Sequence, residues 1–433
     1  MRKLLPAALC ALALAGCDTG SDEPARTSGD PARPSGAAAS PPGDGRVEPA
    51  EIRAPGLREH LRALRDIADA NDGNRAAGTP GDAASVEYVA GRLREAGWRV
   101  RLDPVSFRYF DQRSPPRLGG LRRGDDFRTL TYSGSGRVEG PVRRLGLGCR
   151  RGELGQLGED DVAVVDRGEC FFRDKARNAE SAGAAALLIV DRESDEAPSA
   201  TLGAPGIRIP VLVVGAAAGR ALGPRVELEV EAVSERRRTT NVIAETATGR
   251  GERVVMAGGH LDSVPAGAGI NDNGSGVAAL LELGGALGGR APGARVRLAF
   301  WGAEELGLIG SRRYVRGLEQ ADRDRIAAYV NLDMVGSPEP ARGVYSDGDP
   351  AIERLLRRLV GPRAEEENAG GRSDHAPFDR AGIPVGGLFT GAGRPHDPCY
   401  HRACDDLSNV DMAVLVEMTR AAGEAVERLS TRN

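Results

Sequence analysis

One stretch, residues 254–276, limits what this chain can fold into more than any other part of the sequence. It reads VVMAGGHLDSVPAGAGINDNGSG. Its apolar start predicts a buried strand of a parallel or mixed sheet, which ends in two glycines and His260. Asp272 then precedes an apolar run that predicts a helix at 277–287. A histidine at a strand's carboxyl end lies where open α/β sheets bind ligands. Taken alone, however, such a His and Asp pair is more often structural than metal-binding.

The remaining apolar runs predict an α/β architecture. Strands are predicted at residues 98–102, 241–245, 295–301, 327–333 and 383–389. Helices are predicted at residues 56–70, 83–96, 351–360 and 412–429. Strands that alternate with helices indicate a mixed, mostly parallel central sheet with helices on both faces.

Ionisable side chains gather at the ends of these predicted strands. The set is His260, Asp272, Glu304, Glu305, Asp333 and His401. Carboxylates that meet at one sheet edge repel each other and lose hydration unless a cation or hydrogen bonds compensate them. Nitrogen and oxygen ligands without thiolate suit zinc, with manganese or cobalt as substitutes. Even five ligands from this set of six would be too many for one catalytic zinc with an open position, and they would suit two ions with a bridging carboxylate.

The motifs around these residues resemble those of a known enzyme family. HLDSV, GINDNGSG, WGAEELGLIGS, NLDMVG, GRSDHAPF and CYHRACD are similar, in this order, to motifs of the dizinc aminopeptidases of metallopeptidase clan MH. The exported bacterial members are the most similar. The resemblance covers about residues 55–110 and 240–430. It implies the zinc exopeptidase fold and two zinc ions.

The resemblance also assigns ligands to each metal. It implies that His260 and Asp333 bind one zinc ion, that Glu305 and His401 bind the other, and that Asp272 bridges them. Each position holds the residue type that the family uses.

Further roles follow from the same resemblance. Glu304 is expected to be the general base, and Tyr400 is expected to hold the oxyanion. Asp262 is expected to fix the imidazole of His260. Arg372 and Phe389 fall where the family builds its substrate pocket.

The other histidines receive no ligand role. His375 lies in the SDH motif, but the family places its ligand at His401, so His375 is left out of the site. We expect His60 and His396 to face solvent.

Residues 131–235 differ from the rest of the chain. The run DRGECFFRDKARNAESAGAAALLIV resembles a protease-associated (PA) domain, a small β-rich module inserted in several peptidases. The alternative is a βαβ piece of the main sheet. We favour the insertion because the strands of the first unit resume only afterwards. Arg167, Phe171 and Phe172 are candidates for substrate contact, but we favour a salt-bridged arginine and buried aromatic rings. The peptidase domain would then comprise residues 51–130 and 236–433.

The amino terminus indicates export. Arg2 and Lys3 precede an apolar segment, residues 4–14, that is too short for a permanent membrane span. The following LAGC resembles a bacterial lipobox, which implies a signal peptide at 1–16 and lipid on Cys17. The alternative is an ordinary secretory signal with an incidental cysteine. We expect a protein anchored by lipid at the cell surface or periplasmic side of the bacterial membrane, or released to the medium.

The sequence also predicts a linker and two disulfides. Residues 17–50 are rich in Gly, Ala, Ser, Pro and Asp and contain almost no large apolar residue, which predicts a disordered linker. Four cysteines remain, and they allow three pairings in an oxidising compartment. We predict one bond from Cys149 to Cys170 and another from Cys399 to Cys404.

The net charge of −4 gives no support for binding to nucleic acid. The resemblance implies an exported aminopeptidase that acts on peptides with a free amino terminus through a metal-activated water, and we expect a monomer. A carboxypeptidase or dipeptidase of the same clan is the alternative. A mononuclear glutaminyl cyclase fits less well because that branch does not keep the full ligand set. An inactive binding protein would have lost ligands, whereas all five are present.

Overall fold

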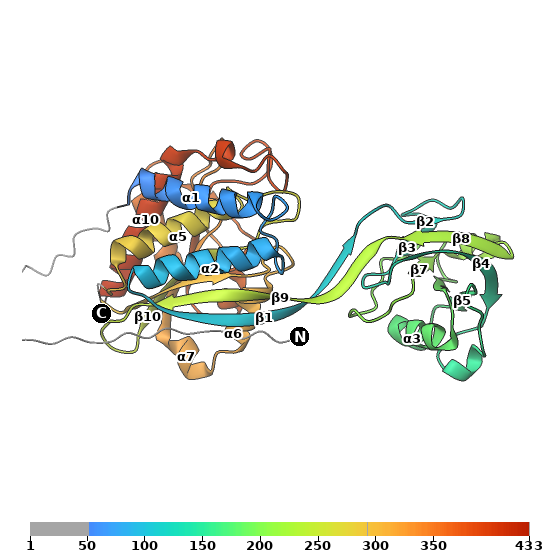
Figure 1. Ribbon diagram of the computed structural model, residues 1–433. Helices are drawn as coiled ribbons and strands as arrows, with labels where there is room; N and C mark the ends of the chain where they lie inside the picture. Colours follow the sequence, from blue (N-terminus) through green and yellow to red (C-terminus); the bar gives the residue numbers. More distant parts are fainter. Residues whose placement is uncertain (1–51, 292, 433) are drawn as a thin grey trace, which may run out of the picture. The chain divides into compact units, whose positions relative to one another are not determined.

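Two separate β-sheets organise the computed structural model, which describes residues 52–291 and 293–432 (Figure 1). The predicted signal peptide at 1–16, the predicted linker at 17–50 and the predicted lipidation site Cys17 lie outside the described residues. Within the described part of the chain, no helix combines the length and the apolar character needed to cross a membrane.

The larger sheet has eight strands in the order β1-β9-β11-β10-β12-β15-β13-β14. Their bounds are β1 (Arg99–Gln112), β9 (Ala232–Glu245), β10 (Val254–His260), β11 (Arg295–Trp301), β12 (Ile326–Leu332), β13 (Gly343–Tyr345), β14 (Glu365–Glu367) and β15 (Val385–Phe389). The central strands β11, β10, β12 and β15 are parallel, whereas β1, β9 and β13 join antiparallel neighbours. The predicted mixed α/β sheet is confirmed.

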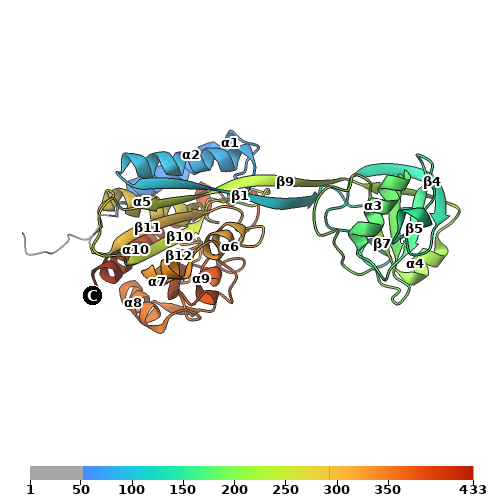
Figure 2. The ribbon, with the colours of Figure 1, turned by 90° about the horizontal axis from the view of Figure 1, so that it is seen from below.

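Helices cover both faces of this sheet (Figures 1 and 2). One face packs against α1 (Ala54–Asp69), α2 (Pro80–Glu95), α5 (Gly274–Leu287), α8 (Pro350–Val360) and α10 (Met412–Thr431). The other face packs against α6 (Ile309–Arg316) and α9 (Ala376–Arg380), while α7 (Gln320–Arg325) leads into β12. The predicted helices lie within a few residues of the observed ones because each carries an apolar face at helical spacing.

The two glycines of β10 allow close packing beside the functional edge of the sheet. Every residue of this strand is buried. A Cβ atom on Gly259 would lie 2.4 Å from the carbonyl oxygen of Leu332 and 2.9 Å from Nδ2 of Asn273. Glycine is therefore needed here so that β10 can bring His260 close to its neighbours.

Strands β1 and β9 are much longer than predicted. They pair antiparallel from Arg99–Glu245 to Gln112–Ala232 and form one two-stranded ribbon. The sequence predicted only residues 98–102 and 241–245. Pro104 interrupts the strand pattern, yet β1 is an edge strand, where proline is tolerated.

The smaller sheet belongs to the inserted module. Its seven strands follow the order β2-β8-β4-β5-β6-β7-β3. They are β2 (Arg117–Leu118), β3 (Phe127–Thr129), β4 (Gly136–Arg144), β5 (Val162–Asp166), β6 (Ala186–Val190), β7 (Val211–Val214) and β8 (Arg225–Val230), accompanied by α3 (Phe172–Ala182) and α4 (Ala216–Ala221). Alternate residues of β5, β6 and β7 enter two apolar clusters, one on each face. The module thus has its own core, and its interpretation as part of the main sheet is wrong.

One disulfide and one salt bridge hold the segment that precedes α3 in this module. The structure joins Cys149 to Cys170. Arg167 pairs with the buried carboxylate of Asp191, as expected. The prediction of a buried ring at Phe171 is wrong, since its exposure is 82%. Phe171 is the residue before the first turn of α3, and the helix directs Phe172, rather than Phe171, towards the apolar cluster.

The expectation for His60 is also wrong. This side chain is buried between α1 and α2, where its Nδ1 lies 2.7 Å from the hydroxyl of Tyr88. Burial and the nearby Arg92 lower the pKa of His60 to about 4, so the imidazole is neutral at pH 7. The sequence did not reveal this because the partner is on another helix.

Candidate metal centre

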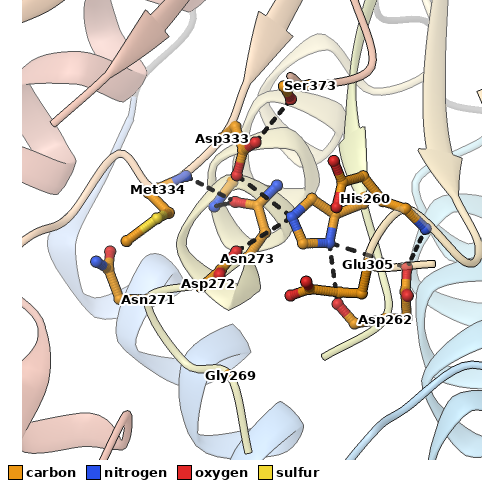
Figure 3. A network of polar contacts seen from close by, with 12 residues as sticks. His260, Asp262, Gly269, Asn271, Asp272, Asn273, Glu305, Asp333, Met334 and Ser373 are labelled. Atoms are coloured by element: carbon orange, nitrogen blue, oxygen red, sulfur yellow. Dashed lines mark hydrogen bonds and ion pairs between the residues drawn. The ribbon is translucent and has the colours of Figure 1, made fainter. Parts of the chain in front are cut away.

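The strand ends of the larger sheet bring the predicted ligands together, and Figure 3 shows His260, Asp272, Glu305 and Asp333 among them. The residues that meet there are His260 at the end of β10, Glu304 and Glu305 after β11, Asp333 after β12, Asp272 before α5, and His401 in the loop after β15. They line a cavity of about 440 Å³. The carboxyl edge of parallel strands is where α/β sheets bind ligands.

Asp272 lies between the two imidazoles. Nε2 of His260 is 3.2 Å from Oδ1 of Asp272 and 3.3 Å from Oδ1 of Asp333. Nε2 of His401 is 3.2 Å from Oδ2 of Asp272 and 3.0 Å from Oε2 of Glu305. The two oxygens of the Asp272 carboxylate therefore face different groups of side chains. Oδ1 faces His260 with Asp333, and Oδ2 faces His401 with Glu305.

These residues fit two metal ions. One group of possible ligands is His260, Asp272 and Asp333, and another is Asp272, Glu305 and His401. Oδ1 of Asp333 and Oε1 of Glu305 are buried without a hydrogen-bond partner. Unpaired carboxylate oxygens are costly inside a protein unless a cation compensates them. Nitrogen and oxygen donors without sulfur match the preferences of zinc.

A third grouping combines His260 with Glu304 and Glu305. The side chain of Glu304 thus lies within reach of a metal as well as within reach of a water beside it. The geometry allows Glu304 to be a metal ligand or a general base, and the substitution Glu304→Gln can distinguish these two roles.

Asp262 acts on the backbone in this structure. Its carboxylate is 3.9 Å from Nδ1 of His260, too far for a hydrogen bond, and its own carbonyl oxygen makes the 3.0 Å contact with this nitrogen. The carboxylate instead accepts a 3.0 Å hydrogen bond from the backbone N–H of Glu304. Asp262 therefore ties the His260 strand end to the Glu304 loop.

Asp405 and Asn273 support the bridging position of Asp272, although no role was predicted for either residue. The carboxylate of Asp405 accepts hydrogen bonds from the backbone N–H groups of Asn271 (2.8 Å) and Asp272 (3.0 Å). The side chain of Asn273 caps α5 and also accepts from the backbone N–H of Met334. The only available sequence signal was an Asn directly before Gly-Ser-Gly, which favours a helix cap.

Ser373 is another residue without an assigned role. Its hydroxyl donates a 2.6 Å hydrogen bond to Oδ2 of Asp333 (Figure 3). The other oxygen of Asp333, Oδ1, faces His260. Ser373 thus holds the carboxylate with one oxygen turned towards the cavity.

The loop that carries His401 is closed by a disulfide. The structure joins Cys399 to Cys404, with Tyr400 and His401 between them. His401 has a φ of 58°, a left-handed conformation that is unfavourable for residues other than glycine. The covalent closure of a short loop helps to hold this backbone in place.

The surrounding carboxylates give both imidazoles a strong affinity for protons. Burial pushes the pKa of His260 down, but the nearby Asp333 and Glu304 outweigh burial and raise this pKa well above its usual range. Hydrogen bonds to Asp272 and Glu305 raise the pKa of His401 to about 10. Burial pushes the pKa of Asp272 up, but hydrogen bonds from the two imidazoles lower it to about 2.

The two adjacent glutamates resist ionisation. Burial raises the pKa of Glu305 to about 7, and the charge of Asp272 contributes to this rise. Burial also raises the pKa of Glu304 well above its usual range, with further contributions from Asp374 and Asp333. Crowded negative charge of this kind is relieved by bound cations.

Tyr400 keeps its proton at the rim of the cavity. Its ring stacks on the His401 imidazole with centroids 3.8 Å apart. Burial and the carboxylates of Asp272 and Glu305 raise the pKa of Tyr400 above its usual range. The phenol is therefore available as a hydrogen-bond donor.

The predicted pocket residues Arg372 and Phe389 both line the cavity, beside apolar Met334 and Ala392. The Arg372 side chain is 76% exposed, and its Nε donates to the carbonyl oxygen of Ala369.

The remaining histidines differ in position. His375 is buried beside Tyr345, with ring centroids 4.6 Å apart, and belongs to none of the possible metal-ligand groups of the described residues. His396, which was expected to face solvent, lines the cavity and is partly buried.

A second cavity of about 420 Å³ lies where β10 and β11 begin, away from the metal ligands. Its charged groups largely pair with one another: Arg297 and Arg295 contact Glu245, and Arg325 contacts Glu252. The cavity at the strand ends is the one with clustered metal-binding side chains.

Comparisons with known proteins agree with this geometry. Residues 241–426 match Peptidase family M28, and residues 138–222 match the PA domain. An aminopeptidase of Pseudomonas aeruginosa is 37% identical over 425 residues, which span 85% of this chain and 79% of the relative. The probable lipoprotein aminopeptidase LpqL of Mycobacterium tuberculosis is 40% identical over 414 residues, which span 84% of this chain and 82% of the relative.

A solved structure is also similar. The structure of a zinc aminopeptidase from Bacillus subtilis aligns with a TM-score of 0.61 and 25% sequence identity. The alignment covers 89% of this chain and 97% of that protein. The similarity therefore extends through both sheets.

Proposed function

Because this chain belongs to peptidase family M28 and is a zinc-dependent aminopeptidase with an inserted PA domain, we propose that it removes residues one at a time from the amino terminus of peptides by means of two zinc ions. The observation that carries this proposal is the position of Asp272, whose two carboxylate oxygens face separate donor sets. His260 and Asp333 would complete one set, and Glu305 and His401 the other.

When bound, the zinc ions would supply Lewis-acid chemistry for the scissile carbonyl and lower the pKa of a water molecule. Glu304 would take a proton from this water and deliver it to the leaving amine. Its raised pKa makes the ionised carboxylate a stronger base, and bound cations would favour the ionised form at neutral pH. Tyr400, which keeps its phenolic proton, would donate a hydrogen bond to the oxyanion.

The charge of the cavity favours an amino terminus over a carboxyl terminus. Its described lining contains several carboxylates, and Arg372 is the one arginine or lysine among those residues. This arginine lies 3.8 Å from Glu367 and is largely exposed. A carboxypeptidase needs a cation for the substrate carboxylate, so this cavity suits the alternative activity less well. Phe389 and Met334 would contact an apolar amino-terminal side chain.

We propose that the protein is exported and carries lipid on Cys17. The lipobox-like LAGC and the relative described as a probable lipoprotein aminopeptidase support this proposal. The two disulfides fit an oxidising compartment. Mass spectrometry of the mature amino terminus should find a diacylglyceryl group on Cys17, and its absence would leave an ordinary secretory signal.

We also propose a peptidase domain interrupted by the PA module in a monomeric protein. The predicted module begins at residue 131, but β2 and β3 of its sheet precede that position. Sheet membership therefore supports a first border close to Gln112, where β1 ends. The second border, predicted after residue 235, falls close to the start of β9 at Ala232.

The activity can be tested with a peptide library. The protein without residues 1–50 would be supplied with zinc and incubated with peptides that have free amino termini and with N-acetylated copies of them. Stepwise loss from the free termini alone, read by mass spectrometry, would support the proposal. Loss from the carboxyl end would favour a carboxypeptidase, and equal cleavage of blocked peptides would exclude recognition of the amino group.

A further inference from the structure

A line of buried polar side chains leads away from the metal centre into the aromatic core. We propose that Trp301, Tyr329 and Asn331 act through Ser373 as one directional hydrogen-bond chain that positions Asp333 and thereby sets the zinc affinity of its site. This inference rests on the proposed function, in which Asp333 is a zinc ligand. The first three are positioning residues, and none of them is among the possible metal ligands.

The chain has four links. Nε1 of Trp301 donates to the hydroxyl of Tyr329 at 2.8 Å, and this hydroxyl donates to Oδ1 of Asn331 at 2.9 Å. Nδ2 of Asn331 donates to Oγ of Ser373 at 2.8 Å, and Ser373 donates to Oδ2 of Asp333 at 2.6 Å. Trp301, Tyr329, Asn331 and Ser373 are all buried.

The direction of the chain follows from its first member. An indole N–H can only donate, so the Tyr329 hydroxyl accepts there and uses its single proton elsewhere. That proton goes to the carbonyl oxygen of Asn331, which turns the amide NH₂ towards Ser373. Ser373 accepts from the amide and therefore directs its own proton at Asp333. An ionised carboxylate can only accept, so Trp301 and Asp333 fix the same direction from the two ends of the chain.

The chain gives the two carboxylate oxygens of Asp333 different surroundings. Oδ2 is occupied by Ser373, while Oδ1 is buried without a hydrogen-bond partner and lies 3.3 Å from Nε2 of His260. Oδ1 is thus the oxygen left for the metal. If the Asn331 amide were reversed, its oxygen would face Ser373 and would compete with Asp333 for the serine proton.

Strand geometry and packing keep the chain rigid. Tyr329 and Asn331 lie two residues apart on β12, so both side chains point to the same face, and Asp333 continues this spacing past the strand end. Tyr329 stacks on Phe378 with ring centroids 4.0 Å apart, and the Trp301 ring lies 5.8 Å from that of Phe378. A packed aromatic core leaves few other rotamers for these polar groups.

The substitution Tyr329→Phe tests the chain because it removes one hydroxyl and keeps the ring. We expect the zinc affinity of the Asp333 site to fall at least tenfold, as is typical when a partner of a metal ligand is lost. Competition with a chromophoric chelator would give both zinc dissociation constants. Absorption bands of the cobalt-substituted protein would report the geometry of the Asp333 site independently of activity.

Tyr314→Phe is the matched control. Tyr314 belongs to the same aromatic cluster, with its ring 5.1 Å from that of Trp301, but its hydroxyl bonds to Arg297 outside the chain. Zinc constants of the Tyr314→Phe variant should match those of the wild type. Equal losses in both variants would mean a general effect of the aromatic core and would overturn the proposal.

The last link provides a second test. Ser373→Ala should weaken the same zinc site, and Ser373→Thr, which keeps a hydroxyl, should restore its affinity. In the double variant Tyr329→Phe with Ser373→Ala, the loss of zinc affinity should equal that of Ser373→Ala alone. Without the Ser373 hydroxyl, Tyr329 no longer acts on Asp333, so its substitution has no further effect. Additive losses, or an unchanged zinc constant in folded Tyr329→Phe protein, would overturn the chain. Zinc constants remain measurable even if the peptide library disproves the aminopeptidase activity, so the two failures are distinguishable.

Discussion

At the scale of single residues, we propose that the adjacent glutamates Glu304 and Glu305 have different tasks, general base and metal ligand. We predict that Glu304→Gln retains both zinc ions but loses turnover by about 10²–10⁴-fold, the usual contribution of a general acid–base group. Glu305→Gln should lose one zinc, because its carboxylate belongs to the donor set with His401. Metal analysis together with kcat for both variants checks this division. Zinc loss in Glu304→Gln would instead make Glu304 a ligand.

Zinc binding should release protons. In the metal-free site, hydrogen bonds to Asp272 and Glu305 raise the pKa of His401 to about 10. Burial and the charge of Asp272 raise the pKa of Glu305 to about 7. Zinc requires the deprotonated forms, so it must displace protons that these groups hold at neutral pH, and its affinity should fall as pH falls. Calorimetry at pH 7 in buffers of different ionisation enthalpy should show at least about one proton released. A heat that does not depend on the buffer would contradict this expectation.

The residues of the site were predictable to different degrees. His260 and Asp333 follow apolar strands, and strand ends meet at one edge, so their proximity could be argued from the sequence. Asp405 and Ser373 act through contacts made only by the folded chain, and no local pattern distinguishes them. A weak signal existed for Asn331, since an amide inside an apolar strand needs buried partners.

At the scale of elements, the close approach of β10 to β12 depends on the absence of a Cβ atom at Gly259. We predict that Gly259→Ala shifts β10, costs about 1–3 kcal/mol of stability as overpacking typically does, and reduces zinc content at the His260 site. The added Cβ would lie 2.4 Å from the carbonyl oxygen of Leu332, a backbone atom that cannot move aside freely.

Gly285→Ala on α5 is the control for this change. Apart from the neighbouring backbone of α5 itself, no atom lies within 4 Å of the added methyl group, and alanine favours a helix. Its stability should be unchanged or higher by up to about 1 kcal/mol, with normal zinc content. Thermal unfolding and metal analysis of both variants give the comparison, and normal zinc in Gly259→Ala would contradict the packing argument.

The strands show why some elements were predictable. Strand β10 is buried along its whole length, and its continuous apolar run predicted it closely. Strand β14 (Glu365–Glu367) is a run of charges held by pairing with β13, which no local propensity indicates. The outer part of β1 was missed although Val105, Phe107 and Tyr109 are buried in alternation with exposed residues, because Pro104 interrupts the pattern before them.

At the scale of the whole chain, the two sheets have separate cores, so the module should be removable. We predict that replacing residues 113–231 with an Asn-Gly turn, which would join Gln112 to Ala232, leaves a folded domain that binds zinc. Turnover of a small amino-terminal substrate should stay within about tenfold of that of the intact protein, a change of no more than about 1.4 kcal/mol in the barrier. Loss of zinc binding or of the folded state would show that the larger sheet depends on the module.

The two ends of the module, Gln112 and Ala232, are paired, and this pairing bears on the order in which the larger sheet can fold. Residues Arg99 and Glu245 are partners at the far end of the ribbon, and an open chain would have to close the whole intervening loop before they met. Once the module has formed its own sheet, Gln112 and Ala232 are already neighbours, and the remaining search is that of a hairpin. A module that folds first would therefore shorten the loop that must close before β1 and β9 pair, from the whole insertion to a two-stranded turn.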